Sequence, residues 1–170
     1  MLKGTIASVR DLSRTLRSTG LDKRGLVSTV RLYCKEFSRR KRLKVDFFAT
    51  GIDEATLDFN MKINLYRIIQ EGLTNAKKHA DANHVTIRLV ESFPNIILCI
   101  EDDGTGFDLQ DRLISAANER CMGLRIIEER AVLLQGKIKI ETYPKQGTKI
   151  VVEVPYQDKK IGRKENRLNC

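Results

Sequence analysis

Hydrophobic residues recur along this sequence with two different spacings, and each spacing predicts a type of element. In residues 60–80 they return every three to four positions, which is typical of a helix with one buried face. Residues 24–42 show the same helical spacing, and residues 2–18 show it as a narrower stripe that suits a helix paired with another helix. Residues 123–134 predict a further helix, with Gly136 placed as its C-terminal cap.

Strand patterns occupy much of the remaining chain. Residues 44–49 alternate between apolar and polar positions, and residues 83–102 predict two strands around a turn at Phe93–Asn95. Residues 137–155 predict a hairpin that turns at Pro144–Gly147. Helices and strands in mixed order, with hairpin-linked strands late in the chain, predict an α/β sandwich with a mixed, largely antiparallel sheet.

The composition is that of a soluble domain of ordinary size. The 170 residues are 41% hydrophobic, which is enough for one core with an extension beside it. No apolar run approaches the length of a membrane span and no signal-peptide core begins the chain, so we expect a cytoplasmic protein. Four scattered cysteines without metal-ligand spacing fit reduced thiols: Cys34, Cys99, Cys121 and Cys170.

The net charge of +9 is unevenly distributed. Residues 1–44 hold 13 basic and 3 acidic side chains, residues 45–156 hold 13 and 17, and residues 157–170 hold 5 and 2. A mildly acidic middle is therefore flanked by basic arms. The cluster Arg39–Lys44 is compatible with binding to nucleic acid or anionic lipid. Because no aromatic residues interleave it, we favour a solvated helix end and expect no nucleic acid partner.

Three carboxylates and two glycines form the run "EDDGTGFD" at residues 101–108, directly after the apolar stretch 95–100. On its own, such a run is typical of a solvated turn. Its order also allows Asp102 to be aimed at a nucleotide base, while Gly104 and Gly106 let the backbone pass close to the ligand. No GxxxxGK[ST] sequence occurs in the chain, so a P-loop nucleotide site is excluded.

Four polar residues share one edge of the predicted helix 60–80, beside its buried stripe: Glu71, Asn75, Lys78 and His79. An ordinary wet helix face explains most of this edge, but Asn is a poor helix former that usually has a reason to lie mid-helix. A carboxylate and an amide one turn apart can orient a hard cation whose other ligands are phosphate oxygens. Further on, Gly123 opens the predicted helix 123–134, whose free N–H groups favour anions.

These residues lie in three segments: "LYRIIQEGLTNAKKHADANHVTIRL" (65–89), "IEDDGTGFD" (100–108) and "MGLRIIEERAVLLQGKIKIETYPKQGTKIVVEVP" (122–155). In this order they resemble the N box and the two glycine boxes of the ATP-binding domain shared by sensor histidine kinases, type II topoisomerases and heat-shock chaperone ATPases. The match is closest to sensor kinases of the nitrate-sensor and desaturase-regulator type. Residues 16–40 are similar to the segment that joins the dimerisation helices of those kinases to the ATPase domain.

The resemblance implies a fold and a division of the chain. The fold is a two-layer α/β sandwich of the Bergerat ATPase type, with a mixed sheet preceded by N-terminal helices. The implied parts are a remnant of a dimerisation helix (1–20), a connecting helix (21–43), an ATP-binding kinase domain (44–156) and a basic flexible tail (157–170).

The resemblance also implies a role for each matching residue. Asp102 hydrogen-bonds the adenine amino group with Thr148 assisting, and Asn75 holds the Mg²⁺ that bridges the phosphates of ATP. Glu71 is the catalytic residue that helps to activate the phosphoryl acceptor. The other implied ATP-binding residues are Lys78 and His79 at the phosphate end, and Gly104, Gly106, Gly123 and Leu124 around a lid.

Two features depart from the family pattern. The phosphoacceptor histidine of the family is followed by an acidic residue, whereas here His79 precedes Ala80 and His84 precedes Val85. We therefore expect a protein histidine kinase domain that transfers the γ-phosphoryl group of Mg-ATP to a histidine on a separate segment or chain. In the lid, residues 120–122 are Arg, Cys and Met where the family has another glycine. Either the lid is less flexible and retains ATP less well, or Arg120 compensates by reaching a phosphate.

The expected partners are a histidine-bearing dimerisation segment or sensor kinase, and indirectly a response regulator. A homodimer is compatible with the apolar stripe in residues 2–18. Two alternative functions remain open. One is a non-catalytic, truncated kinase that acts as an interaction or inhibitory module, and the other is a serine kinase of the anti-sigma-factor type.

Overall fold

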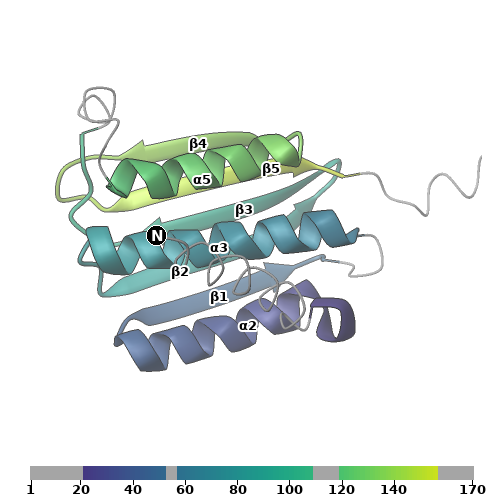
Figure 1. Cartoon of the computed structure of the whole chain (residues 1–170), viewed down its shortest axis with the longest axis horizontal. Helices are drawn as coiled ribbons and strands as arrows, with labels where there is room; N and C mark the ends of the chain where they lie inside the picture. Colours follow the sequence, from purple (N-terminus) through teal and green to yellow (C-terminus); the bar gives the residue numbers. More distant parts are fainter. Residues whose placement is uncertain (1–20, 53–56, 109–118, 157–170) are drawn as a thin grey trace, which may run out of the picture.

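Five strands form a single sheet in the computed structural model, which describes residues 21–52, 57–108 and 119–156 (Figure 1). The strands are β1 (Lys44–Thr50), β2 (His84–Ser92), β3 (Asn95–Asp102), β4 (Lys137–Thr142) and β5 (Thr148–Pro155). Their order across the sheet is β1-β2-β3-β5-β4. Only the β1–β2 pair is parallel, and the other three pairs are antiparallel, so the predicted mixed, largely antiparallel sheet is confirmed.

Among the described residues, three helices cover one face of this sheet, which gives the predicted two layers (Figure 1). They are α2 (Leu21–Lys41), α3 (Phe59–His79) and α5 (Glu119–Leu133). Helix α3 begins after Asp58, whose carboxylate accepts a hydrogen bond from the backbone N–H of Met61 at 2.7 Å. This N-cap satisfies a donor that has no partner within the helix.

The core lies between the two layers. As far as Leu89 in β2 and Ile100 in β3, every second side chain is buried, because successive residues of a strand point to opposite faces and only one face meets the helices. The apolar stripe of α3 supplies the opposing surface, with Ile69 and Leu73 fully buried. The side chains that build this interface from the sheet include Val85, Ile87, Leu89, Ile96, Leu98, Ile100, Ile150 and Val152.

The boundaries of α5 differ from the prediction. The helix begins at Glu119, so Gly123 is its fifth residue and does not open it. At the other end Gln135 adopts the left-handed conformation (φ 55°), and Gly136 donates to the carbonyl of Ala131 at 2.8 Å. The left-handed position is therefore one residue earlier than the predicted glycine cap. Gly136 is needed for close approach instead, because an added Cβ would lie 2.6 Å from the carbonyl oxygen of Glu153.

Several predicted features lie outside the described residues. These are the helix over residues 2–18, the tail 157–170 and lid residues 109–118, together with the side chains of residues 119–121. Within the described ranges, no helix combines the length and the apolar character that crossing a membrane requires.

Candidate functional site

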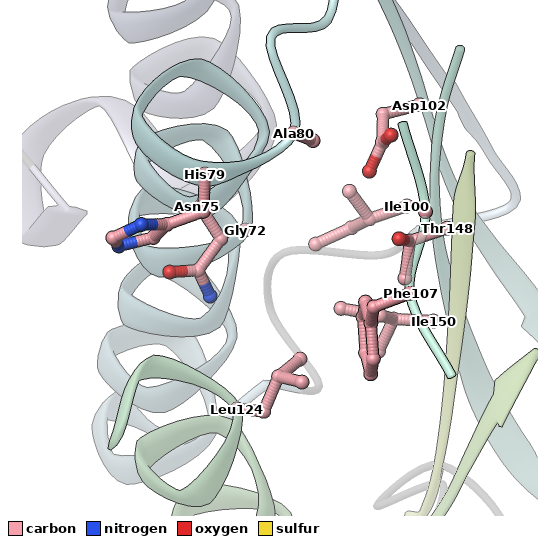
Figure 2. Close-up of a pocket in the computed structure, with 11 residues that line it drawn as sticks. Gly72, Asn75, His79, Ala80, Ile100, Asp102, Phe107, Leu124, Thr148 and Ile150 are labelled. Atoms are coloured by element: carbon pink, nitrogen blue, oxygen red, sulfur yellow. The ribbon is translucent and has the colours of Figure 1, made fainter. Parts of the chain in front are cut away.

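A cleft opens between α3 and the adjoining ends of β3 and β5, with the start of α5 at one side (Figure 2). It contains about 430 Å³ of space, part of which is open to solvent. Six of the residues predicted for the site line it: Asn75, His79, Asp102, Gly106, Leu124 and Thr148. The structure therefore brings together segments that are far apart in the sequence, from the predicted polar helix edge, the acidic run and both glycine boxes.

The three consecutive carboxylates of the acidic run have three different environments. Glu101 is exposed and pairs with Arg88, with Nη1 and Oε2 3.3 Å apart. Asp103 accepts hydrogen bonds of 2.9 Å from the backbone N–H groups of residues 83–84. Asp102 lies between them in sequence and lines the cleft. The run therefore provides one carboxylate for the cleft and uses the other two to hold the surrounding chain.

The Asp102 side chain is held by backbone donors inside the cleft. The N–H of Gly104 donates to its Oδ1 at 2.9 Å (Figure 2 shows the carboxylate facing the cleft). Burial raises the pKa of Asp102, while hydrogen bonds from the backbone at Gly104 and Thr148 lower it in part, and the net pKa is above the ordinary value. A carboxylate fixed in this way can accept a hydrogen bond from an N–H group of a ligand.

The two glycines of the acidic run pack against protein backbone, which differs from the expectation that they make room for a ligand. An added Cβ at Gly104 would collide with the carbonyl oxygen of Ala80. One at Gly106 (φ 57°) would collide with the carbonyl oxygen of Tyr143 and lie 2.9 Å from that of Gly147. Their absent side chains thus let the loop lie directly against the end of α3 and the β4–β5 turn. Of the two, Gly106 also lines the cleft.

Glu71 and Asn75 meet α5 and are not on a wet helix face. An added Cβ at Gly123 would lie 2.7 Å from both Nδ2 of Asn75 and Oε1 of Glu71. Glycine at this position therefore lets α5 pack onto the polar edge of α3. The N–H of a fifth helical residue has a partner within the helix, so the predicted anion-binding terminus at Gly123 is wrong.

Burial affects Asn75 and Glu71 in different ways: it leaves an amide nitrogen of Asn75 unpaired and shifts the pKa of Glu71. The Nδ2 atom of Asn75 is buried and has no hydrogen-bond partner among the described residues. Such unpaired groups are rare in folded proteins and leave a donor for a ligand or water. Burial raises the pKa of Glu71, and the nearby positive charges of Lys78, Arg130 and His79 oppose that rise.

Of the remaining predicted residues on α3, α5 and β5, all but Lys78 line the cleft. Lys78 is exposed and is not part of the lining, whereas His79 is part of it. Leu124 is buried, and Thr148 lies 3.3 Å, oxygen to oxygen, from Thr142. The cleft is thus lined by polar and apolar side chains together.

Five residues of the lining were not singled out from the sequence: Gly72, Ala80, Ile100, Phe107 and Ile150. Two of them could have been predicted from the alternation of side chains along a strand. Ile100 precedes Asp102 by two positions and Ile150 follows Thr148 by two, so each lies on the same strand face as a predicted site residue. Their register, Ile100 opposite Ile150 and Asp102 opposite Thr148, makes one continuous wall.

Residues 60–158 match the family model described as histidine kinase-, DNA gyrase B- and HSP90-like ATPase. The chain belongs to this ATPase family. The match includes every residue that we placed in the site, and it confirms the resemblance found in the motifs.

Relatives of this ATPase domain are kinases by name. The chain is 35% identical over 155 residues to the signal transduction histidine-protein kinase/phosphatase DegS of Brevibacillus brevis, covering 91% of this chain and 39% of DegS. It is 35% identical over 153 residues to the sensor histidine kinase ComP of Bacillus subtilis, covering 90% of this chain and 19% of ComP. The chain thus spans 39% or less of the length of these two relatives.

Solved structures confirm the predicted fold. The histidine kinase domain of a blue-light activated histidine kinase from Erythrobacter litoralis EL346 superposes with a TM-score of 0.65 at 20% identity. That comparison covers 88% of this chain and 74% of the other. At this level of identity the likeness concerns the fold, which is the two-layer α/β sandwich with a mixed sheet.

Proposed function

We propose that this chain is the ATP-binding catalytic domain of a sensor histidine kinase, which transfers the γ-phosphoryl group of ATP to a histidine on a separate segment or chain. The observation that carries the proposal is Asp102, a carboxylate held by the Gly104 N–H inside an apolar cleft of an ATPase-family domain. The names of the relatives support the kinase class.

Adenine binding follows from the chemistry of the cleft wall. Asp102 accepts a hydrogen bond from the exocyclic amino group, and Thr148 beside it offers a hydroxyl. Ile100 and Ile150 provide an apolar surface for the base, and the missing side chain of Gly72 lets α3 pack directly against Ile100. Burying a flat ring between such groups is favourable, because apolar surface leaves water while its polar edge keeps a hydrogen bond.

The proposed phosphate end of the site lies around Asn75, since Ala80 at the C-terminal end of α3 lies near Asp102 (Figure 2). Asn75 offers an amide whose Nδ2 has no partner among the described residues, and Lys78 and His79 add donors one turn further on. The described ranges contain no cluster of three or more His, Cys, Asp or Glu side chains that could hold a metal. Asn75 would hold a Mg²⁺ ion through its amide oxygen, with phosphate oxygens of ATP and water as the other ligands. When bound, Mg²⁺ neutralises phosphate charge.

Glu71 is the proposed catalytic carboxylate. It lies one helical turn before Asn75, and its pKa is raised by burial, which favours the taking up of a proton from the acceptor histidine. Gly104, Gly106, Gly123 and Leu124 frame the lid over the nucleotide in this proposal.

The cellular context is part of the same proposal. The acceptor histidine belongs to a dimerisation segment or to a sensor kinase, and a response regulator then receives the phosphoryl group in the cytoplasm. The division into residues 1–20, 21–43, 44–156 and 157–170 stays a prediction.

Calorimetric titration of the full 170-residue chain with ATP, with and without Mg²⁺, tests the nucleotide site. Asp102→Ala should weaken binding about a hundredfold, because it removes a charged hydrogen-bond acceptor from a half-buried position. Glu101→Ala is the matched control, since it removes the neighbouring carboxylate outside the cleft and should bind like the wild type. Equal ATP affinity in the wild type and Asp102→Ala contradicts the proposed adenine contact.

Phosphoryl transfer needs a second assay. The chain is mixed with the histidine-bearing dimerisation segment of a relative and with ATP labelled at the γ-phosphate. Transfer of label to the segment, lost in Glu71→Gln while ATP binding persists, is the expected result. Binding without any transfer would favour the alternative of a non-catalytic module.

A further inference from the structure

Strand β1 forms one edge of the sheet, at the end opposite β4 (Figure 1). It pairs with β2 on one side, and no strand of the described residues lies on its other side. An edge strand of this kind presents alternate N–H and C=O groups that a further strand can bond. Between β1 and α2 runs an open groove with about 850 Å³ of space, much of it open to solvent.

Helix α2 contributes three cations to this groove. Arg31, Lys35 and Arg39 follow one another at intervals of four residues, so they lie along one face of the helix, and all three are exposed. No ion pair joins Lys35 or Arg39 to an acidic side chain within the described residues. The nearest acidic residue on the helix, Glu36, pairs instead with Arg40 at 3.9 Å.

Strand β1 contributes aromatic rings and one carboxylate. The guanidinium of Arg31 lies 5.6 Å from the centre of the Phe47 ring, a cation–π distance that orients it over the groove. Phe48 is 55% exposed, although it is large and apolar. Asp46 is the acidic residue of the lining, and its Oδ2 lies 2.8 Å from Nε2 of His84 and 3.5 Å from Nζ of Lys44. Its charge is therefore already paired.

We propose that this groove binds an extended acidic segment of a partner protein, which adds to β1 as a further strand. Its Asp or Glu side chains meet Arg31, Lys35 and Arg39. The spacings agree, because four residues of helix advance about 6 Å and two residues of strand advance about 6.6 Å. The geometry thus points to acidic residues at alternate positions, with apolar side chains between them against Phe48.

Two other occupants fit the groove less well. A second copy of the chain would bring the same three cations against one another, which disfavours pairing of β1 with β1. A nucleic acid or an anionic membrane offers phosphate oxygens, which accept hydrogen bonds but cannot donate to the free carbonyl groups of a strand edge. A peptide backbone supplies both donors and acceptors.

The test uses fluorescence anisotropy with the full chain and a labelled nine-residue peptide of alternating Glu and Val. A peptide of the same composition with all Glu residues in one block, and one with Lys in place of Glu, are the ligand controls. The alternating peptide should bind at least about tenfold more tightly than either, since only its side chains match the spacing of the cations.

Charge reversal on α2 tests the surface itself. Lys35→Glu with Arg39→Glu should weaken binding of the alternating peptide about tenfold or more. Lys23→Glu with Arg24→Glu is the matched control, because it makes the same change of charge at exposed positions of α2 before its kink at Gly25, outside the groove, and its binding should equal that of the wild type. Circular dichroism checks that both variants stay folded. Hydrogen exchange should show slower exchange of amides in residues 44–50 when peptide is bound.

Several results would contradict the binding of an acidic strand to this groove. Undiminished binding in Lys35→Glu/Arg39→Glu, or exchange in β1 that peptide leaves unchanged, excludes this groove. Tighter binding of single-stranded DNA or phosphatidylserine vesicles, with the same loss in the double variant, replaces the acidic strand by a phosphate ligand. A dimer in sedimentation that the double variant abolishes replaces it by a second copy.

Discussion

Gly72 in the middle of α3 faces Ile100 on β3 across the wall of the cleft, and Gly72→Ala tests how tightly the proposed adenine pocket is built. An added Cβ would lie 2.7 Å from Cδ1 and 3.3 Å from Cγ2 of Ile100. Carbon atoms in ordinary contact are about 3.5–4.0 Å apart, so the end of the Ile100 side chain has to move by about 1 Å. Because both residues line the cleft, that movement changes the shape of the pocket.

Two opposing contributions set the effect of Gly72→Ala on stability. Alanine is favoured over glycine by about 1 kcal/mol inside a helix. Overpacking a well-filled core costs about 1–3 kcal/mol. The free energy of unfolding should therefore fall by only about 0–2 kcal/mol. ATP affinity should fall about tenfold or more, because the new methyl group pushes the Ile100 side chain into space that the base needs.

Urea denaturation and calorimetric titration with Mg-ATP measure the two effects separately. Ile100→Val removes the Cδ1 atom that clashes and by itself costs about 0.5–1.5 kcal/mol. In the Gly72→Ala/Ile100→Val double variant the loss of stability should be smaller than the sum of the single losses, and ATP affinity should recover in part. Unchanged ATP affinity in Gly72→Ala, or a double variant that binds no better than Gly72→Ala, refutes this reasoning.

Two further predictions concern the acidic run. Gly106→Ala should lower the free energy of unfolding by about 3 kcal/mol, because its left-handed backbone (φ 57°) and the Tyr143 carbonyl both exclude a Cβ. Gly51→Ala is the control in urea, with φ 75° but a nearest contact of 3.1 Å to a side-chain atom, and an equal loss in the two variants would contradict the close-packing argument. Since the pKa of Asp102 is raised, the folded chain binds its proton more tightly than the unfolded chain, so the contribution of Asp102 to stability falls as the pH rises from its ordinary pKa through the raised one. Urea midpoints measured from about pH 3 to about pH 8 should therefore show Asp102→Asn more stable than the wild type at neutral pH. Asp103→Asn should be less stable than the wild type there, because backbone N–H groups outweigh the desolvation of the Asp103 carboxyl and lower its pKa.

Much of the fold was predictable because its signals are local. The helical spacing in residues 60–80 and the paired strand patterns in residues 83–102 and 137–155 each depend on neighbours within one element. Mixed order and hairpin-linked strands then limited the possible sheets. The start of α5 was missed by four residues, since residues 119–122 carry no clear apolar period and belong to the helix only in the folded chain.

For the candidate site, the sequence by itself determined the chemical groups and their order, from Glu71 and Asn75 to Asp102 and Thr148. The motif resemblance also singled out Asp102 among three adjacent carboxylates, but it did not give the partners of the other two, Arg88 for Glu101 and the backbone at residues 83–84 for Asp103.

Only the tertiary structure decided what the glycines do and what covers the polar edge of α3. Gly104 and Gly106 meet the carbonyls of Ala80 and Tyr143, and Gly123 lets α5 cover Asn75. The Ile100 and Ile150 wall arises in the same way, from pairing between β3 and β5. Periodicity is a property of neighbouring residues, whereas these contacts join segments tens of residues apart and exist only once the two layers have packed.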